Sequence, residues 1–232
     1  MSLPVEVLTV QSKCGIWKLQ NVLQLPSIIQ RRQFSLPSLV QSVAWGLHSP
    51  GLLLSGSFDQ SVVLLDWRNG TDPSNRWSVA AIVESLAWDP HNEHQFVVSL
   101  KNGTVQGFDI RAATSNSTSG SKPSYTLHAH DKAVTSVSFN PSAPNLLATS
   151  SNDKMVKLWD LSNNQPSCVA SKNFECGRVF SIAFSEDNPS LLAVGGKKGG
   201  LTVWDILSEP SVAQSFRKLS NQKSEANKMQ TI

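Results

Sequence analysis

Leu147 to Asp160 reads LATSSNDKMVKLWD, and this stretch is the strongest indication of the fold in the sequence. Apolar residues lie in both halves of the stretch, and the polar residues Ser151 to Lys154 between them favour a tight turn. Val156 and Leu158 place apolar side chains on one face of the second half, which a Trp-Asp pair then closes. A hairpin of this kind needs neighbours to bury its apolar face. The stretch therefore predicts further sheets beside it.

The same pattern occurs four times along the chain, marked by two sets of landmarks. The first set is the aspartates that close a strand, and the second is the aromatic residues that end a strand upstream. Both sets are spaced by 43, 51 and 45 residues. Their members are Asp66, Asp109, Asp160 and Asp205, and Trp45, Trp88, Phe139 and Phe184. Repeats of roughly 40–45 residues that end in Trp-Asp predict an all-β fold, a WD40 β-propeller with four recognisable blades.

These repeats divide the chain into three parts. Residues 1–37 have no Trp-Asp close and are expected to form an irregular N-terminal extension, a partial strand of the next blade, or residues outside their usual context. Residues 38–216 are expected to hold the blades, and residues 217–232 a disordered basic tail. The blades themselves are predicted at about 40–80, 83–127, 130–171 and 177–216. Val212 to Phe216 is expected to supply the outer strand of the last blade.

Four blades predict a partial, open ring, because WD40 rings usually close with about seven. Apolar residues of the inner strands, such as Val43 and Trp45, are expected to be buried only against a neighbouring blade. The two terminal faces are therefore expected to be bare and to favour association of the chain.

Composition and charge limit the classes of partner. Hydrophobic residues make up 40% of the chain and charged residues 16%, with a net charge of +3. The segment after Asp205 carries +2 of this charge, so the blades are close to neutral and do not resemble a dedicated nucleic-acid binder. No apolar window is long enough to cross a bilayer, so no membrane partner is expected. Three cysteines without C-x-x-C spacing favour a reducing compartment.

One set of polar residues has the types of a hydrogen-bonded tetrad that braces a WD40 blade: His130, Thr149, Asp153 and Trp159, with Ser151 as the other possible hydroxyl. The alternative is a catalytic pair of His130 with Asp131 or Asp153. No nucleophile elbow such as G-x-S-x-G accompanies these residues, which favours the structural role. We therefore expect no catalytic residues and no enzyme. We also expect no cofactor and no small-molecule substrate.

Two further motifs each have a structural and a functional interpretation. The turn from Gly195 to Gly200 contains Lys197 and Lys198, which could contact RNA or an acidic partner. It lacks the order of a phosphate-binding P-loop and leads into a strand, which favours a simple hairpin turn. His91 and His94 have a loose metal-ligand spacing, but they lie in a predicted loop, and no metal site is expected.

Two blade ends carry an arginine two residues after the closing aspartate, namely Arg68 and Arg111. The structural interpretation is that each arginine is simply an exposed side chain at the rim of its blade. The functional one is a site for a protein partner, because arginine can pair with a carboxylate in a bidentate manner.

Several runs of the sequence, spread over roughly residues 40–216, resemble the C-terminal half of the periodic tryptophan protein 1 family. These runs are Val40–Trp45, Leu54–Val62, Asp109–Arg111, His128–Asp131 and Gly195–Asp205. The resemblance implies a WD40 scaffold in the nucleus, largely in the nucleolus, which supports ribosomal RNA production and processing and assembly of the large ribosomal subunit. It also implies pre-ribosomal assembly factors or ribosomal proteins as partners, with indirect or weak RNA contact.

The chain departs from the family pattern at its front. The acidic N-terminal region and the earlier blades of the family have no match in residues 1–37, which predicts a truncated or alternatively spliced product. The D-x-R blade ends resemble the box by which some WD40 proteins dock onto cullin-type ubiquitin ligases. A substrate receptor or adaptor of such a ligase is therefore the alternative function.

Overall fold

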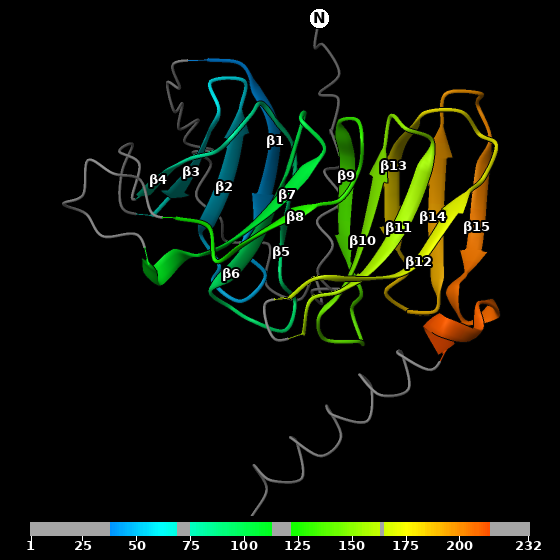
Figure 1. The fold of residues 1–232 in the computed structure, drawn as a ribbon. Helices are drawn as coiled ribbons and strands as arrows, with labels where there is room; N and C mark the ends of the chain where they lie inside the picture. The colour runs from blue at the N-terminus through cyan, green and yellow to red at the C-terminus, as the bar shows by residue number, and fades with distance from the viewer. Residues whose placement is uncertain (1–37, 69–74, 113–121, 163–164, 214–232) are drawn as a thin grey trace, which may run out of the picture. The chain divides into compact units, whose positions relative to one another are not determined.

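The computed structural model describes residues 38–68, 75–112, 122–162 and 165–213. Within these residues the chain is all-β, with four antiparallel sheets that follow one another along the chain (Figure 1). The sheets lie in a single compact unit, Gln33–Ile232, and form a partial propeller, as expected. The predicted N-terminal extension, the basic tail and most of the long loop before β8 lie outside the described residues.

Each sheet is a meander in which consecutive strands are hydrogen-bonded neighbours. The first blade contains β1 (Val40–Trp45), β2 (Leu52–Ser57), β3 (Ser61–Asp66) and β4 (Asn75–Ser78). The second contains β5 (Val83–Trp88), β6 (Gln95–Leu100), β7 (Thr104–Asp109) and β8 (Tyr125–His128). The third contains β9 (Val134–Phe139), β10 (Leu146–Ser151), β11 (Met155–Asp160) and β12 (Ser167–Asn173). The fourth contains β13 (Val179–Phe184), β14 (Leu191–Gly196) and β15 (Leu201–Asp205).

The predicted hairpin from Leu147 to Asp160 consists of β10 and β11. Its strands pair in antiparallel register, with Leu147 opposite Trp159 and Thr149 opposite Lys157. In the turn, the carboxylate of Asp153 accepts a hydrogen bond from the backbone N–H of Met155 at 2.8 Å. This register places Thr149 and Trp159 on one face of the blade, because residues opposite each other in a ladder point the same way.

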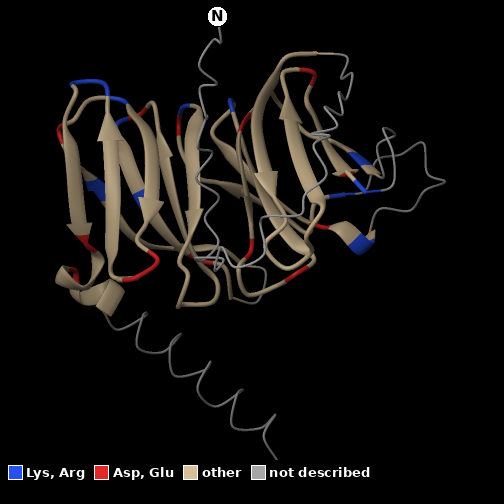
Figure 2. Ribbon diagram, turned by 180° about the vertical axis from the view of Figure 1, so that it is seen from behind, with Lys and Arg blue, Asp and Glu red and all other residues tan. Residues whose placement is uncertain are grey.

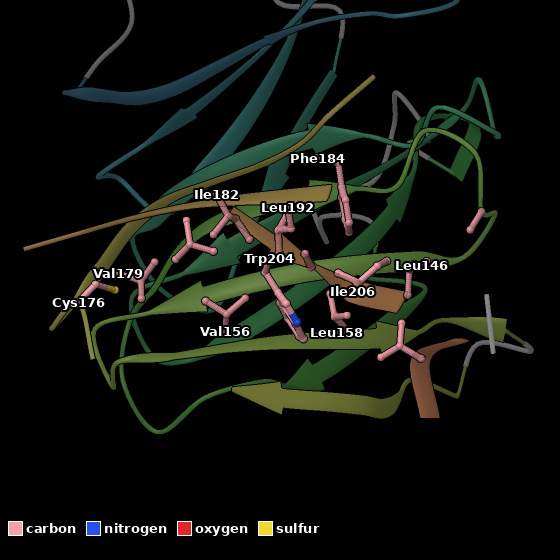
Figure 3. Packing of buried hydrophobic residues seen from close by; sticks show 14 residues of the cluster. Leu146, Val156, Leu158, Cys176, Val179, Ile182, Phe184, Leu192, Trp204 and Ile206 are labelled. Carbon is pink, nitrogen blue, oxygen red and sulfur yellow. The ribbon is translucent and has the colours of Figure 1, made fainter. Parts of the chain in front are cut away.

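The inner strands of successive blades lie side by side, β1 with β5, β5 with β9 and β9 with β13. A cluster of apolar side chains fills the space between each pair of blades. Figure 3 shows the cluster between the third and fourth blades, where Leu146, Val156 and Leu158 meet Ile182 and Trp204. The blades are therefore stabilised mainly by each other, through the removal of apolar surface from water.

Equivalent positions on the blades differ in exposure according to whether a described blade covers them. Trp88 and Phe184 are at most 7% exposed, whereas Trp45, their equivalent in the first blade, is 50% exposed. At the other end, Val203 is 59% exposed, while its equivalent Leu158 is fully buried. Both terminal faces thus leave apolar side chains open to solvent, as the sequence predicted.

The open area of the first face is confined to its inner strand. Val43 and Trp45 on β1 are exposed, but Val63 and Leu65, further out on the same face, are buried. The open area of the last face is wider, since Leu201 on β15 and Phe180 on β13 are also exposed.

The predicted outer strand of the last blade, from Val212 to Phe216, is wrong over its described part. The carboxylate of Asp205 accepts a hydrogen bond from the backbone N–H of Leu207 and caps a short 3-10 helix, η4 (Ile206–Ser208). Pro210 then begins a helical turn, the position that its fixed φ favours. This turn buries Val212 completely in the cluster between the last two blades. Val212 therefore fills the core from a helix and does not extend the sheet.

Candidate functional site

Four side chains of the third blade form a continuous hydrogen-bonded network. His130 lies in the loop before β9, Thr149 in β10, Asp153 in the hairpin turn and Trp159 in β11. Nδ1 of His130 lies 2.8 Å from Oδ2 of Asp153, and Nε2 lies 2.8 Å from Oγ1 of Thr149. The indole Nε1–H of Trp159 donates to the same Oγ1 at 2.9 Å. The structure thus brings together all four residues of the predicted tetrad.

One arrangement of hydrogens satisfies every member of this network. Trp159 donates to Thr149, the hydroxyl of Thr149 donates to Nε2 of His130, and Nδ1–H of His130 donates to the carboxylate of Asp153. This arrangement requires a neutral imidazole. A charged imidazolium would donate from both nitrogens and leave the hydroxyl hydrogen of Thr149 without an acceptor in the network.

Burial makes the neutral form of His130 the favoured one. The imidazole side chain has no exposed surface, and Thr149 is also fully buried. Removing the ring from water lowers the pKa of His130, and this effect outweighs the nearby carboxylate of Asp153, which acts to raise it. The network therefore holds His130 as a neutral imidazole.

The geometry also bears on the alternative catalytic pair. Both ring nitrogens of His130 are bonded to side chains of the network, so neither faces solvent. Asp131 is exposed beside the loop, and its carboxylate forms no hydrogen bond with another described residue. The structure therefore places His130 with Asp153 and separates Asp131 from this network.

The other blades lack the whole network, and the fourth shows the consequence. Trp204 occupies the position of Trp159, but Val194 stands where the third blade has Thr149. The buried Nε1 of Trp204 consequently has no hydrogen-bond partner among the described residues. Lys172 lies over the ring of this tryptophan at 5.1 Å and forms an ion pair with Glu209 at 2.9 Å.

The four closing aspartates share one local role. Each accepts a hydrogen bond from the backbone N–H two residues later and so fixes the chain as it leaves the third strand. The donors are Arg68, Arg111, Ser162 and Leu207, for Asp66, Asp109, Asp160 and Asp205 respectively.

In the first two blades the arginine side chain also returns to the same aspartate. Arg68 donates to Asp66 from Nε and Nη2, both at 2.9 Å, and Arg111 donates to Asp109 at 3.1 and 2.7 Å. These bonds lower the pKa of both aspartates and raise the pKa of both arginines. The arginine side chains remain 55% and 66% exposed. Docking onto a ubiquitin ligase through them stays a prediction.

The remaining sequence candidates lie apart from the network. Lys197 and Lys198 are exposed in the turn between β14 and β15. His91 bonds to the backbone oxygen of Asn140 at 3.0 Å, and His94 lies 3.0 Å from a carboxylate oxygen of Glu93. In the described part of the chain, no group of three or more His, Cys, Asp or Glu side chains is placed to hold a metal ion. None of the helices described there could span a membrane.

A set of hydrogen bonds that the sequence does not predict joins consecutive blades. His48 contacts the backbone oxygen of Pro90 at 3.1 Å, and His91 contacts that of Asn140 at 3.0 Å. The amide of Asn140 donates in turn to the backbone oxygen of Pro189 at 2.7 Å. These partners are more than 40 residues apart, so no local pattern could identify them.

We predict that His130→Ala and Asp153→Ala destabilise the chain more than Asp131→Ala does. Each of the first two changes leaves a buried partner unsatisfied, which costs about 1–3 kcal/mol of the free energy of unfolding. Asp131 is exposed and serves as the matched control. Urea titrations of the three variants measure the difference, and equal midpoints would show that the network does not brace the blade.

We also predict that acid weakens the chain through His130. Because folding lowers its pKa, the unfolded chain binds the proton more readily. The stabilisation is therefore complete above the ordinary histidine pKa of about 6.5 and is lost as the pH falls below it. Unfolding free energies at about pH 7.5 and about pH 5.5 should differ less in His130→Gln than in the parent chain. An unchanged difference would contradict the assignment.

Comparison with known proteins supports the fold and identifies relatives. Residues 121–160 match the family described as "WD domain, G-beta repeat". An uncharacterized WD repeat-containing protein of Schizosaccharomyces pombe is 38% identical over 60% of this chain and 26% of its own length. Periodic tryptophan protein 1 of Saccharomyces cerevisiae is 31% identical over 77% of this chain and 32% of its own length. Its Drosophila melanogaster homolog is 28% identical over 76% and 38%.

The match therefore spans only about a quarter to two fifths of the length of these curated relatives. It nevertheless includes most of this chain, at levels of identity that agree with the resemblance noted in the sequence. The chain therefore contains a WD40 repeat and has homologues named periodic tryptophan protein 1 in yeast and fly.

Proposed function

We propose that the chain is a non-enzymatic scaffold that supports ribosome biogenesis. Its role would lie in ribosomal RNA production and processing and in assembly of the large subunit, in the nucleus and most of all in the nucleolus. The observation that carries the proposal is the match to periodic tryptophan protein 1 over 77% of this chain, because the family resemblance implies this process.

The architecture suits a scaffold. Polar groups that could do chemistry, such as His130 and Asp153, bond to each other inside a blade. Short turns and loops project from a rigid set of sheets and carry exposed charged residues such as Lys197 and Arg111. Loops held by a rigid framework are where binding residues concentrate, and a row of repeats offers several at once.

The partners we propose are proteins, namely pre-ribosomal assembly factors or ribosomal proteins. A WD40 repeat favours protein–protein contact, and the described blades present no large basic sheet face of the kind that tracks nucleic acid. Contact with RNA would then be weak or made through those partners.

Depletion of the gene product that carries this sequence should slow maturation of large-subunit ribosomal RNA. Pulse labelling of precursor RNA measures the effect, and small-subunit precursors in the same cells provide the comparison. Re-expression should restore the rate. Normal large-subunit processing after complete depletion would contradict the proposed function.

A further inference from the structure

One rim of the blades is built from the turns after β6, β10 and β14 together with the loops that enter β5, β9 and β13; we call it the upper rim. Backbone hydrogen bonds join each turn to the adjacent loop. Lys101 N–H donates to the oxygen of Ile82 at 2.9 Å, and Lys197 N–H donates to that of Arg178 at 2.8 Å. The equivalent bond in the third blade joins Asn152 to Ala133 at 3.1 Å. The upper rim is therefore a platform of turns, each of which is hydrogen-bonded to a loop of its own blade.

Cations are concentrated on this platform. Six basic side chains are exposed there, and none forms an ion pair with another described residue. They are Lys101, Lys132, Lys154, Arg178, Lys197 and Lys198. Acids lie among them as well. Asp131 and Glu175 are exposed, Asp153 accepts a hydrogen bond from the neutral His130, and Glu84 at the start of β5 interacts electrostatically with Lys101. The upper rim consequently carries more cations than acids, and the largest local excess is at Arg178, Lys197 and Lys198.

Lys154 occupies a backbone conformation that lysine does not favour. Its φ is +78°, and the equivalent turn positions hold Gly103 and Gly199 at +90° and +78° and Gln60 at +61°. Side chains with a Cβ raise the energy of this left-handed conformation, which glycine adopts without strain. A strained lysine at a position where glycine would fit is a reason to look for a use of its charge.

The opposite rim has the reverse charge. Exposed acids follow the first and third strands there, including Glu93, Glu186 and Asp187. The arginines on that side, Arg68 and Arg111, are neutralised by the aspartates beside them. Figure 2 shows that Asp and Glu are the more frequent charged residues along the lower loops, whereas the upper turns carry Lys and Arg together with some Asp and Glu. The two rims thus differ in the sign of their more frequent charged residues, although each carries both signs.

We propose that the upper rim of the second to fourth blades is a docking surface for an acidic segment of a protein partner. Complementary charge steers such a segment to the platform and selects against basic partners. The proposal names the chemistry of a partner for the scaffold, and in that sense it rests on the proposed function.

The distribution of charge favours an acidic peptide over RNA. Asp131 and Glu175 lie among the cations, and a phosphate backbone with a charge at every nucleotide would meet both. A peptide can place carboxylates at the lysines and neutral residues at these two positions. Single-strand binding surfaces also combine cations with stacking aromatic rings. The described turns and loops of the upper rim carry no exposed aromatic side chain, and the exposed Phe180 near Arg178 lies on β13.

Fluorescence anisotropy of a labelled oligoglutamate peptide with the full purified chain tests the proposal. We expect salt-sensitive binding that Lys197→Glu with Lys198→Glu weakens on the order of tenfold. Lys154→Gly should weaken it about threefold while leaving the urea midpoint unchanged or higher, since glycine relieves the strain. Lys122→Glu is the matched control, because this exposed lysine precedes β8 on the opposite rim and its reversal should leave affinity unchanged.

Equal affinity of the parent chain and the upper-rim variants would overturn the proposal. So would tighter binding of a labelled oligouridine that the same reversals abolish, since this would assign the surface to RNA. Either result would leave the ribosomal RNA depletion experiment unaffected. Normal RNA processing after depletion would conversely leave the peptide measurements valid, so the two failures can be told apart.

Discussion

Each blade of this chain is a small sheet with two apolar faces, and covering both faces is the constraint on which the structure depends. The inner strands of successive blades lie together, and an apolar cluster fills every gap between described blades. The second and third blades have a described neighbour on each side. The first and last have one, and Trp45 and Val203 at the two ends stay largely exposed. The stability of each blade therefore depends on its neighbours, as in other repeat proteins.

Within this arrangement the third blade has an additional brace that the others lack. Its network satisfies the indole of Trp159 through Thr149 and His130, whereas the equivalent indole of Trp204 is buried without a partner among the described residues. A fully satisfied network strengthens a blade, and a partial one costs free energy. Packing and hydrogen bonding inside the blades thus restrict which residues can occur there. The rims are exposed to solvent, and the exposed charged side chains lie mostly on them.

The sequence predicts those features of the fold that depend on the repeats and on residues close to one another in the chain. Strand positions, the turn at Asp153 and the meeting of His130 with Thr149 all follow from residues within one blade. Three features could not be predicted in this way. The bond from Asn140 to Pro189 depends on how two blades meet, and the αL conformation of Lys154 has no residue signature. The apolar run from Val212 to Phe216 predicts a strand, but Asp205 caps η4 and a helical turn follows it, so Val212 lies in a helix.

The central claim is that blades are stabilised by their neighbours, with the third blade the most secure. Hydrogen–deuterium exchange of the intact chain, followed by mass spectrometry of its peptides, tests it most directly. Opening free energies differ across a structure, and exchange reports them segment by segment. If neighbouring blades stabilise one another, exchange is slowest in β9, β10 and β11 and fastest in β1 and β15. Equal protection of β1, β10 and β15 would contradict it.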